Sequence, residues 1–159
     1  MNGPPTTLGL WHDEPSLEIA NTLSSRSLIG QLGIEFTDVD EGSLTARMPV
    51  DQRTHQPTGV LHGGASVALA ETLASWAATF TVDHREASCV GMEINANHLR
   101  AVTSGWVTGV ARPLALGRRT QVWEVRITDE AGSLVCISRC TMAVLPRPSG
   151  TAPGRGGAA

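Results

Sequence analysis

Hydrophobic and polar residues alternate in both halves of the chain, on either side of one long apolar segment. Residues 33–39 and 44–50 alternate with a period of two, which predicts two half-buried strands joined by a turn at residues 40–42. Residues 63–82 are rich in Ala and Leu instead. Their bulky apolar side chains recur at helical spacing, at Leu69, Leu73, Trp76 and Phe80. The middle of the chain is therefore predicted to be one long apolar helix.

The second half of the chain has the pattern of four consecutive strands. They span residues 88–102, 106–116, 119–128 and 134–145, with Gly-containing turns between them. We expect a meander within one antiparallel sheet, with Pro113 at a bulge or an edge. A short helix is expected earlier, at residues 16–25. Because a single apolar helix can be covered only by a sheet that curves around it, this order predicts an α+β domain whose exposed edges invite dimerisation.

The length of 159 residues favours a single domain, which we place at residues 15–146. Residues 1–14 are expected to form a flexible arm that Trp11 attaches to the body, and the Pro/Gly/Ala-rich residues 147–159 a disordered tail. The formal net charge of −3 argues against nucleic acid as a partner. The sequence shows no secretion signal, and Glu71 interrupts the apolar helix, so we expect a cytoplasmic protein that does not enter a membrane.

Glu71 is the only Asp, Glu, Lys or Arg between Thr54 and Val82. Its helical neighbours are small, at Val67, Ala68, Ala74 and Ser75, whereas a solvated helix face would carry several charges. An unpaired carboxylate in an apolar interior costs several kcal/mol. Glu71 is therefore either on an exposed face or a working group in a lined pocket, and the pattern favours the pocket.

The helix begins with the pair Gly63-Gly64, which leaves backbone N–H groups unshielded by side chains. These donors and the positive end of the helix dipole would attract a carbonyl oxygen that gains negative charge. A tight turn with close packing explains the same two glycines equally well. Chemistry alone leaves both interpretations open.

The motif Gly59-x-Leu61-His62-Gly63-Gly64, together with Glu71, resembles the hotdog-fold thioesterases. The similarity extends from about residue 28 to 145 and is carried by MPVDQRTHQPTGVLHGGASVALAE, VGMEINANHLR and LGRRTQVWEVRITDEAGSLVCISR, at residues 48–71, 90–100 and 116–139. It is closest to the Glu-dependent, 4-hydroxybenzoyl-CoA thioesterase-like group that includes 1,4-dihydroxy-2-naphthoyl-CoA thioesterases and enterobactin proofreading thioesterases. The resemblance implies a long helix wrapped by a curved antiparallel sheet of five to six strands.

The resemblance also implies roles for individual residues. Glu71 is expected to be the nucleophile or general base, and the Gly63 N–H to polarise the thioester carbonyl. Gln56 and His62 would flank the thioester opposite a Glu71 from the other subunit, and Ser75 would position water. A homodimer is expected because the site needs two chains, and a homotetramer by resemblance.

Basic residues are candidates for binding coenzyme A. His98 and Arg100 lie in phase on one predicted strand and are either surface polar residues or ligands of the coenzyme A phosphates. We expect Arg100 to act together with Arg118 and Arg119, because arginine clusters suit phosphate. No metal site is expected, since the His and Cys residues match no ligand pattern. No cofactor is expected either, because coenzyme A is part of the substrate.

The predicted function is hydrolysis of aryl or medium-chain acyl-CoA thioesters, with 1,4-dihydroxy-2-naphthoyl-CoA as one candidate. The alternatives are proofreading of misacylated carrier protein and binding of acyl-CoA without hydrolysis. A hotdog dehydratase pattern is not visible. Trp76 follows Glu71 closely, and its indole either lines the acyl pocket or fills the core.

Overall fold

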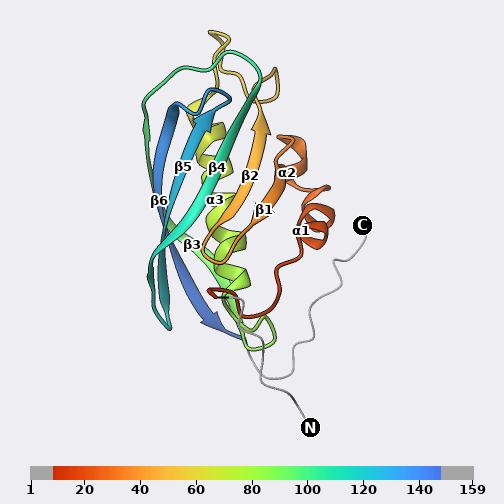
Figure 1. Ribbon diagram of the computed structural model, residues 1–159, viewed down its shortest axis with the longest axis vertical. Coiled ribbons are helices and arrows are strands. Elements are labelled where there is room, and N and C mark those ends of the chain that lie inside the picture. The colour runs from red at the N-terminus through yellow and green to blue at the C-terminus, as the bar shows by residue number, and fades with distance from the viewer. Residues whose placement is uncertain (1–8, 148–159) are drawn as a thin grey trace.

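The computed structural model describes residues 9–147 and has one long helix at its centre. This helix, α3 (Gly63–Phe80), lies in the concave side of a six-stranded antiparallel sheet (Figure 1). The strands are β1 (Glu35–Val39), β2 (Leu44–Pro49), β3 (Ala87–His98), β4 (Trp106–Leu116), β5 (Thr120–Asp129) and β6 (Leu134–Pro146). Two short helices, α1 (Leu17–Ser24) and α2 (Leu28–Gln31), cover one flank of the helix. The predicted α+β fold is confirmed.

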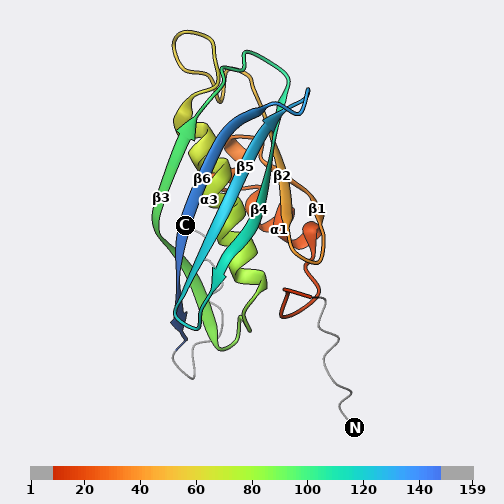
Figure 2. The same cartoon turned by 60° about the vertical axis from the view of Figure 1, so that its left-hand side comes forward.

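The strand order in the sheet is β1-β2-β4-β5-β6-β3. Strands β4, β5 and β6 form the expected meander, but β3 does not belong to it. Instead β3 lies at the sheet edge beside β6, while β4 pairs with β2, so the connection at residues 99–105 crosses from one side of the sheet to the other (Figure 2). The expectation of four strands paired in chain order is therefore wrong. This crossing lets the sheet enclose α3 from both sides, and it leaves β3 as one edge.

Burial of α3 is broader than the predicted stripe. Leu69 and Leu73 are fully buried, as expected, whereas Trp76 and Phe80 are only partly buried. A second row on the helix is buried as well, and it consists of Ala70, Ala74, Ala77 and Ala78. These small side chains let the backbone of α3 approach the curved sheet closely, which a helix with a single bulky stripe would not do.

The segment before β1 is held by two specific contacts. Trp11 is only 3% exposed; its Nε1–H donates to the Asp40 carbonyl at 2.6 Å, and its ring stacks on Trp123. Asn21 in α1 bonds both the N–H and the carbonyl of Phe36, at 2.9 and 3.0 Å. The expected attachment through Trp11 is confirmed for residues 9–14, and Asn21 covers the free edge of β1. The predicted arm at residues 1–8 and tail at 148–159 lie outside the described residues.

Three further local features concern Pro113, the cysteines of β6 and helix α2. The register between β4 and β5 shifts between Pro113 and Ala115, so Pro113 marks a bulge. Cys136 and Cys140 are fully buried in the core. Helix α2 was not predicted; Ser27 caps it by accepting a hydrogen bond from Ile29 N–H.

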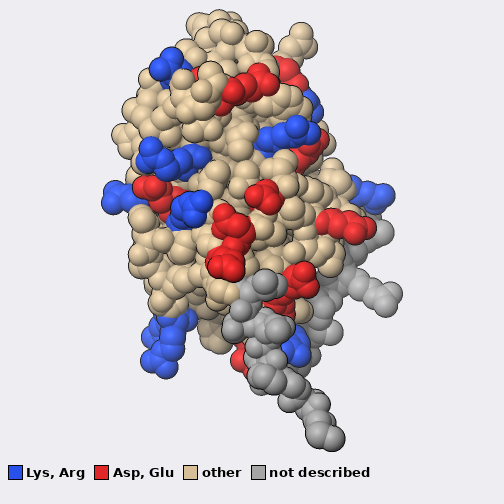
Figure 3. Space-filling view, viewed as in Figure 1, with Lys and Arg blue, Asp and Glu red and all other residues tan. Residues whose placement is uncertain are grey.

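Charged side chains of both signs are interspersed over the outer face of the sheet (Figure 3). Glu124 lies between Arg112 and Arg139 in the strand register, and its carboxylate is 3.8 Å from the Arg126 guanidinium. Within the described residues, no helix has the length and apolarity needed to cross a membrane.

Gly109 of β4 packs closely against buried leucines of α3, and it offers a test of this packing. A Cβ at this position would lie 2.6 Å from Cδ1 of the fully buried Leu73. Gly109→Ala is expected to lower the free energy of unfolding by about 1–3 kcal/mol, because the packed core must shift to accept a methyl group. Urea denaturation measures this loss. Gly42→Ala is the control, since a Cβ there meets nothing closer than 3.9 Å, and an equal loss in both variants would contradict the packing argument.

Candidate active site

The loop before α3 is fixed by backbone hydrogen bonds. His62 N–H donates to the Thr54 carbonyl at 2.8 Å, and Leu61 N–H donates to the Val102 carbonyl at 2.7 Å. Gln56 closes a tight turn, with its N–H donating to the Val60 carbonyl at 2.9 Å. The loop therefore presents the start of α3 in a defined position against the sheet.

The first turn of α3 leaves one donor free. His62 is the N-cap, and its Nδ1 accepts from Gly64 N–H at 2.8 Å. Ala65 and Ser66 donate to the His62 carbonyl. Among the hydrogen bonds of residues 9–147, none uses Gly63 N–H. A free N–H at the positive end of a helix is a donor suited to a developing oxyanion.

Gly63 lines a cavity of about 420 Å³, which we call the Gly63 cavity. Gln56, Gly63, His98 and Arg100 all line it. The His98 imidazole lies directly against Gly63, where a Cβ would be 2.9 Å from Nε2. The structure therefore brings together four of the residues predicted from the sequence. His62 is exposed beside them at the helix start, with Nδ1 engaged by the cap.

A second cavity of about 270 Å³, the Glu71 cavity, lies further along α3. Glu71, Ser75 and Trp76 line it together with apolar residues from the α2 region, namely Leu28, Ile29, Leu32 and Ile34. The Glu71 side chain is half-buried and also contacts β3, where a Cβ on Gly91 would overlap Glu71 Oε1. A half-buried carboxylate beside apolar side chains does not fit the solvated-face interpretation.

Trp76 combines the two roles that the sequence left open. One side of its indole lines the Glu71 cavity, and the ring also contacts Phe36 and Phe80, with centroid distances of 5.6 and 5.5 Å. It is thus a cavity wall supported by the core.

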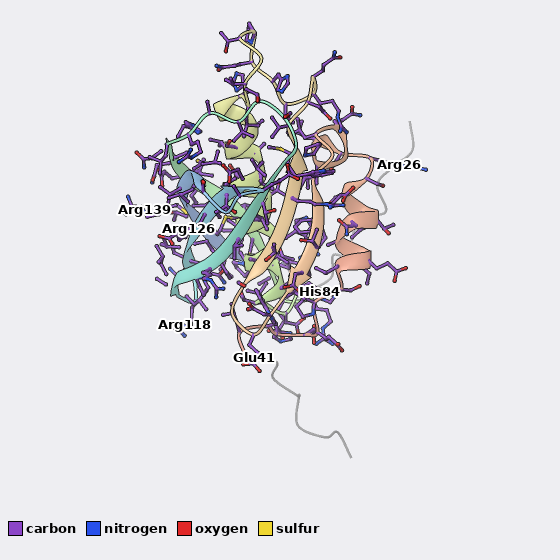
Figure 4. The ribbon with its side chains drawn as sticks, turned by 45° about the horizontal axis from the view of Figure 1, so that its top comes forward. Arg26, Glu41, His84, Arg118, Arg126 and Arg139 are labelled. Carbon is purple, nitrogen blue, oxygen red and sulfur yellow. The ribbon has the colours of Figure 1, made fainter. Side chains whose placement is uncertain are left out.

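Some predicted residues are not brought together within one chain. Gly63 and Glu71 line different cavities and are separated by about 12 Å along α3, at about 1.5 Å per residue. Arg118 and Arg119 lie at the turn between β4 and β5, and Figure 4 labels Arg118 there. Arg100 follows the end of β3 and precedes the start of β4, so it lies at the opposite end of the sheet. The three arginines of one chain therefore do not form a single phosphate site.

The electrostatic surroundings of Glu71 affect a neighbouring thiol. Burial, followed by the negative charges of Glu71 and Glu93, raises the pKa of Cys140 to about 12. A thiol held protonated in this way is a poor nucleophile. Within residues 9–147, no three His, Cys, Asp or Glu side chains are grouped in a manner that would hold a metal ion.

Two features of the site were missed in the sequence. Gly91 gives the Glu71 carboxylate its space, and a glycine inside a predicted strand was an available signal for a close approach. The apolar wall formed by Leu28, Ile29 and Leu32 belongs to a helix of four residues, which is too short to show periodicity.

Comparisons with known proteins identify the family to which this chain is similar. Residues 58–136 match the thioesterase superfamily. A 1,4-dihydroxy-2-naphthoyl-CoA hydrolase from Escherichia coli is 47% identical over 136 residues, which cover 86% of this chain and 99% of the relative. A proofreading thioesterase, EntH, from Cronobacter turicensis is 51% identical over 137 residues, which cover 86% and 98% of the two chains.

Solved structures show the same similarity. The crystal structure of a mutant of thioesterase PA1618 from Pseudomonas aeruginosa superposes with a TM-score of 0.87 at 52% identity, covering 87% of this chain and all of the other. Thioesterase HI1161 from Haemophilus influenzae gives a TM-score of 0.84 at 49% identity, covering 86% and 95%. The chain therefore belongs to the thioesterase superfamily and is a thioester hydrolase with the hotdog fold.

Proposed function

We propose that the protein hydrolyses aryl or medium-chain acyl-CoA thioesters at a site shared by two chains. The observation that carries this proposal is the free Gly63 N–H at one cavity, with Glu71 half-buried in another. The substrate carbonyl oxygen accepts a hydrogen bond from Gly63 N–H, which stabilises the negative charge that develops on it. The Glu71 carboxylate then either attacks the carbonyl carbon or removes a proton from an attacking water.

The rest of the reaction needs little assistance. The C–S bond breaks, and the coenzyme A thiolate leaves as a stable anion that takes its proton from solvent. If Glu71 attacks directly, water hydrolyses the resulting anhydride and regenerates the carboxylate. If it acts as a base, the activated water adds to the carbonyl, the tetrahedral intermediate expels the thiolate to leave the free acid, and Glu71 returns its proton to solvent. Ser75 lies one helical turn after Glu71 in the same cavity, where its hydroxyl can hold the water.

A dimer formed through β3 explains why the two groups lie apart in one chain. Asn21 covers the edge at β1, whereas β3 is an open edge of 12 residues with exposed Val90 and Met92. Such edges pair readily with a second copy. On β3, Gly91 touches Glu71 and His98 touches Gly63. An antiparallel pairing centred near Ile94 would bring each Gly63 cavity close to the partner's Glu71.

The two cavities then divide the substrate between them. The Glu71 cavity, with its apolar wall and Trp76, suits the acyl group. The Gly63 cavity, which includes His98 and Arg100, suits the polar pantetheine arm and phosphates. Arg118 and Arg119 remain predicted phosphate ligands, and they would have to come from a different subunit than Arg100.

Proofreading of carrier-bound acyl groups is the second candidate, and the name of the Cronobacter relative favours it. The two functions differ in what carries the acyl group. Thiol release from benzoyl-CoA compared with benzoyl carrier protein separates them, because a proofreading enzyme would turn over the protein-bound thioester faster.

Glu71→Gln tests the carboxylate. We expect kcat/KM to fall about 100-fold or more, because the amide neither attacks nor accepts a proton. Thiol release from benzoyl-, hydroxynaphthoyl- and straight-chain acyl-CoA measures this effect. Glu86→Gln, an exposed carboxylate just after α3, is the matched control. Unchanged turnover in Glu71→Gln would exclude this residue as the catalytic carboxylate. If the wild-type protein binds acyl-CoA but does not turn it over, the protein would be a non-hydrolytic acyl-CoA binder.

Gly63→Pro tests the oxyanion donor. Proline removes the N–H but is tolerated at the first helical position, and His62 already has the extended conformation that a following proline requires, with φ −69 and ψ 132. We expect a loss of about 10²–10³ in kcat, as for removal of one oxyanion donor. Gly63→Ala adds the same Cβ next to His98 but keeps the N–H. Equal losses in the two variants would attribute the effect to steric contact with His98.

Mixed dimers test whether the site is shared. One chain carries Glu71→Gln and the other Gly63→Pro, with different affinity tags so that the mixed species can be purified. A shared site leaves one of two sites intact, so we expect about half of the wild-type turnover per dimer. A site contained within one chain would leave both sites defective, and no activity would return.

A further inference from the structure

The outer face of α3 continues beyond the Glu71 cavity into another hollow of about 390 Å³. This hollow lies between α1 and the C-terminal part of α3, and we call it the α1–α3 groove. Its apolar lining consists of Ile19, Leu23, Trp76, Phe80 and Val82. None of these residues except Trp76 takes part in the site described above.

Trp76 is the shared wall of the groove and the Glu71 cavity. The two hollows therefore adjoin across one side chain, whose indole is held by Phe36 and Phe80. From Glu71 to Phe80 the helix rises about 14 Å, which an extended alkyl chain of roughly ten to twelve carbons would span.

Several side chains that line this path are exposed to solvent although they are apolar. Ile19 is 58% exposed and Leu23 68%, and both come from α1. Leu28, which lines the adjoining Glu71 cavity, is 65% exposed. Single exposed apolar residues are ordinary, but a contiguous apolar surface commonly marks a binding site. Three such residues along two adjoining hollows form a continuous apolar path.

Charge at the rim indicates which part of a substrate fits the groove. Asp13 and Glu14 border it, so the phosphates of coenzyme A would be repelled there. Arg100 and His98 line the Gly63 cavity instead. The apolar end of the substrate is therefore the end that would point towards α1.

We propose that the α1–α3 groove is a distal subsite for the alkyl tail of the acyl group, which passes over Trp76 from the Glu71 cavity. This proposal rests on the proposed thioesterase site and specifies its medium-chain substrates as straight chains of about ten to twelve carbons. The C-terminal residues 148–159, PSGTAPGRGGAA, contain no large apolar side chain, so this segment of the chain is poorly suited to fill the groove.

The test compares butanoyl-CoA with dodecanoyl-CoA in the wild type and in Leu23→Asp. The longer substrate reaches the groove and the shorter one does not. We expect wild-type kcat/KM to be higher for dodecanoyl-CoA, and the ratio of the two values to fall about tenfold in Leu23→Asp, since about two methylene contacts are lost. Leu114→Asp is the control, because Leu114 is 56% exposed on β4, outside the cavities described above, and should leave the ratio unchanged.

Each other outcome is informative. A wild type that prefers butanoyl-CoA, or a ratio that Leu23→Asp leaves unchanged, would overturn the subsite while the thioesterase proposal stands. If neither substrate is hydrolysed, the straight-chain part of the proposed function fails, and thiol release from benzoyl-CoA decides whether the aryl part stands. The subsite is then tested by calorimetric binding of both acyl-CoAs to Glu71→Gln, where equal affinities would overturn it. A Leu23→Asp variant that dissociates an oligomer in sedimentation would assign the groove to a second copy of the chain and also overturn the proposal.

Discussion

The fold depends on enclosing one helix that has almost no charge. Helix α3 presents buried leucines on one side and buried alanines on another, so a flat sheet would leave part of its apolar surface in water. The sheet meets this requirement by curving around α3, and β3, which pairs with β6, extends the sheet along one side of the helix. The sheet leaves the outer face of α3 uncovered, and both Glu71 and the apolar hollows lie on this face.

In the proposed mechanism, the same helix supplies both reacting groups. Its first turn supplies an unpaired N–H, because the His62 cap satisfies Gly64 and leaves Gly63 free. Two turns later it supplies a carboxylate in apolar surroundings. Since both groups are fixed to one rigid element, they cannot approach each other within a chain. A second chain is therefore the simplest way to unite them, and the open edge at β3 offers a route for it.

Much of this arrangement could be predicted from the sequence, because it depends on local signals. Period-two alternation located the strands, and the glycine pair after His62 located the start of α3. The pairing of β3 with β6 could not be predicted in this way, because it is a contact between distant segments without a local signal. For the same reason Arg118 was grouped with Arg100 on residue type, although the strands place them at opposite ends of the sheet. Helix α2 was missed because four residues show no period.

Gly91 has a consequence for how this protein can vary. Its missing side chain is the space that the Glu71 carboxylate occupies, so the two positions are not independent. A larger residue at 91 would push the Glu71 carboxylate out of the place that it holds here, since a Cβ there would overlap Oε1. Sequence variation at position 91 of β3 is therefore restricted by the space that the Glu71 carboxylate needs. Among relatives that keep a glutamate at position 71, substitution of the glycine at 91 should be rare.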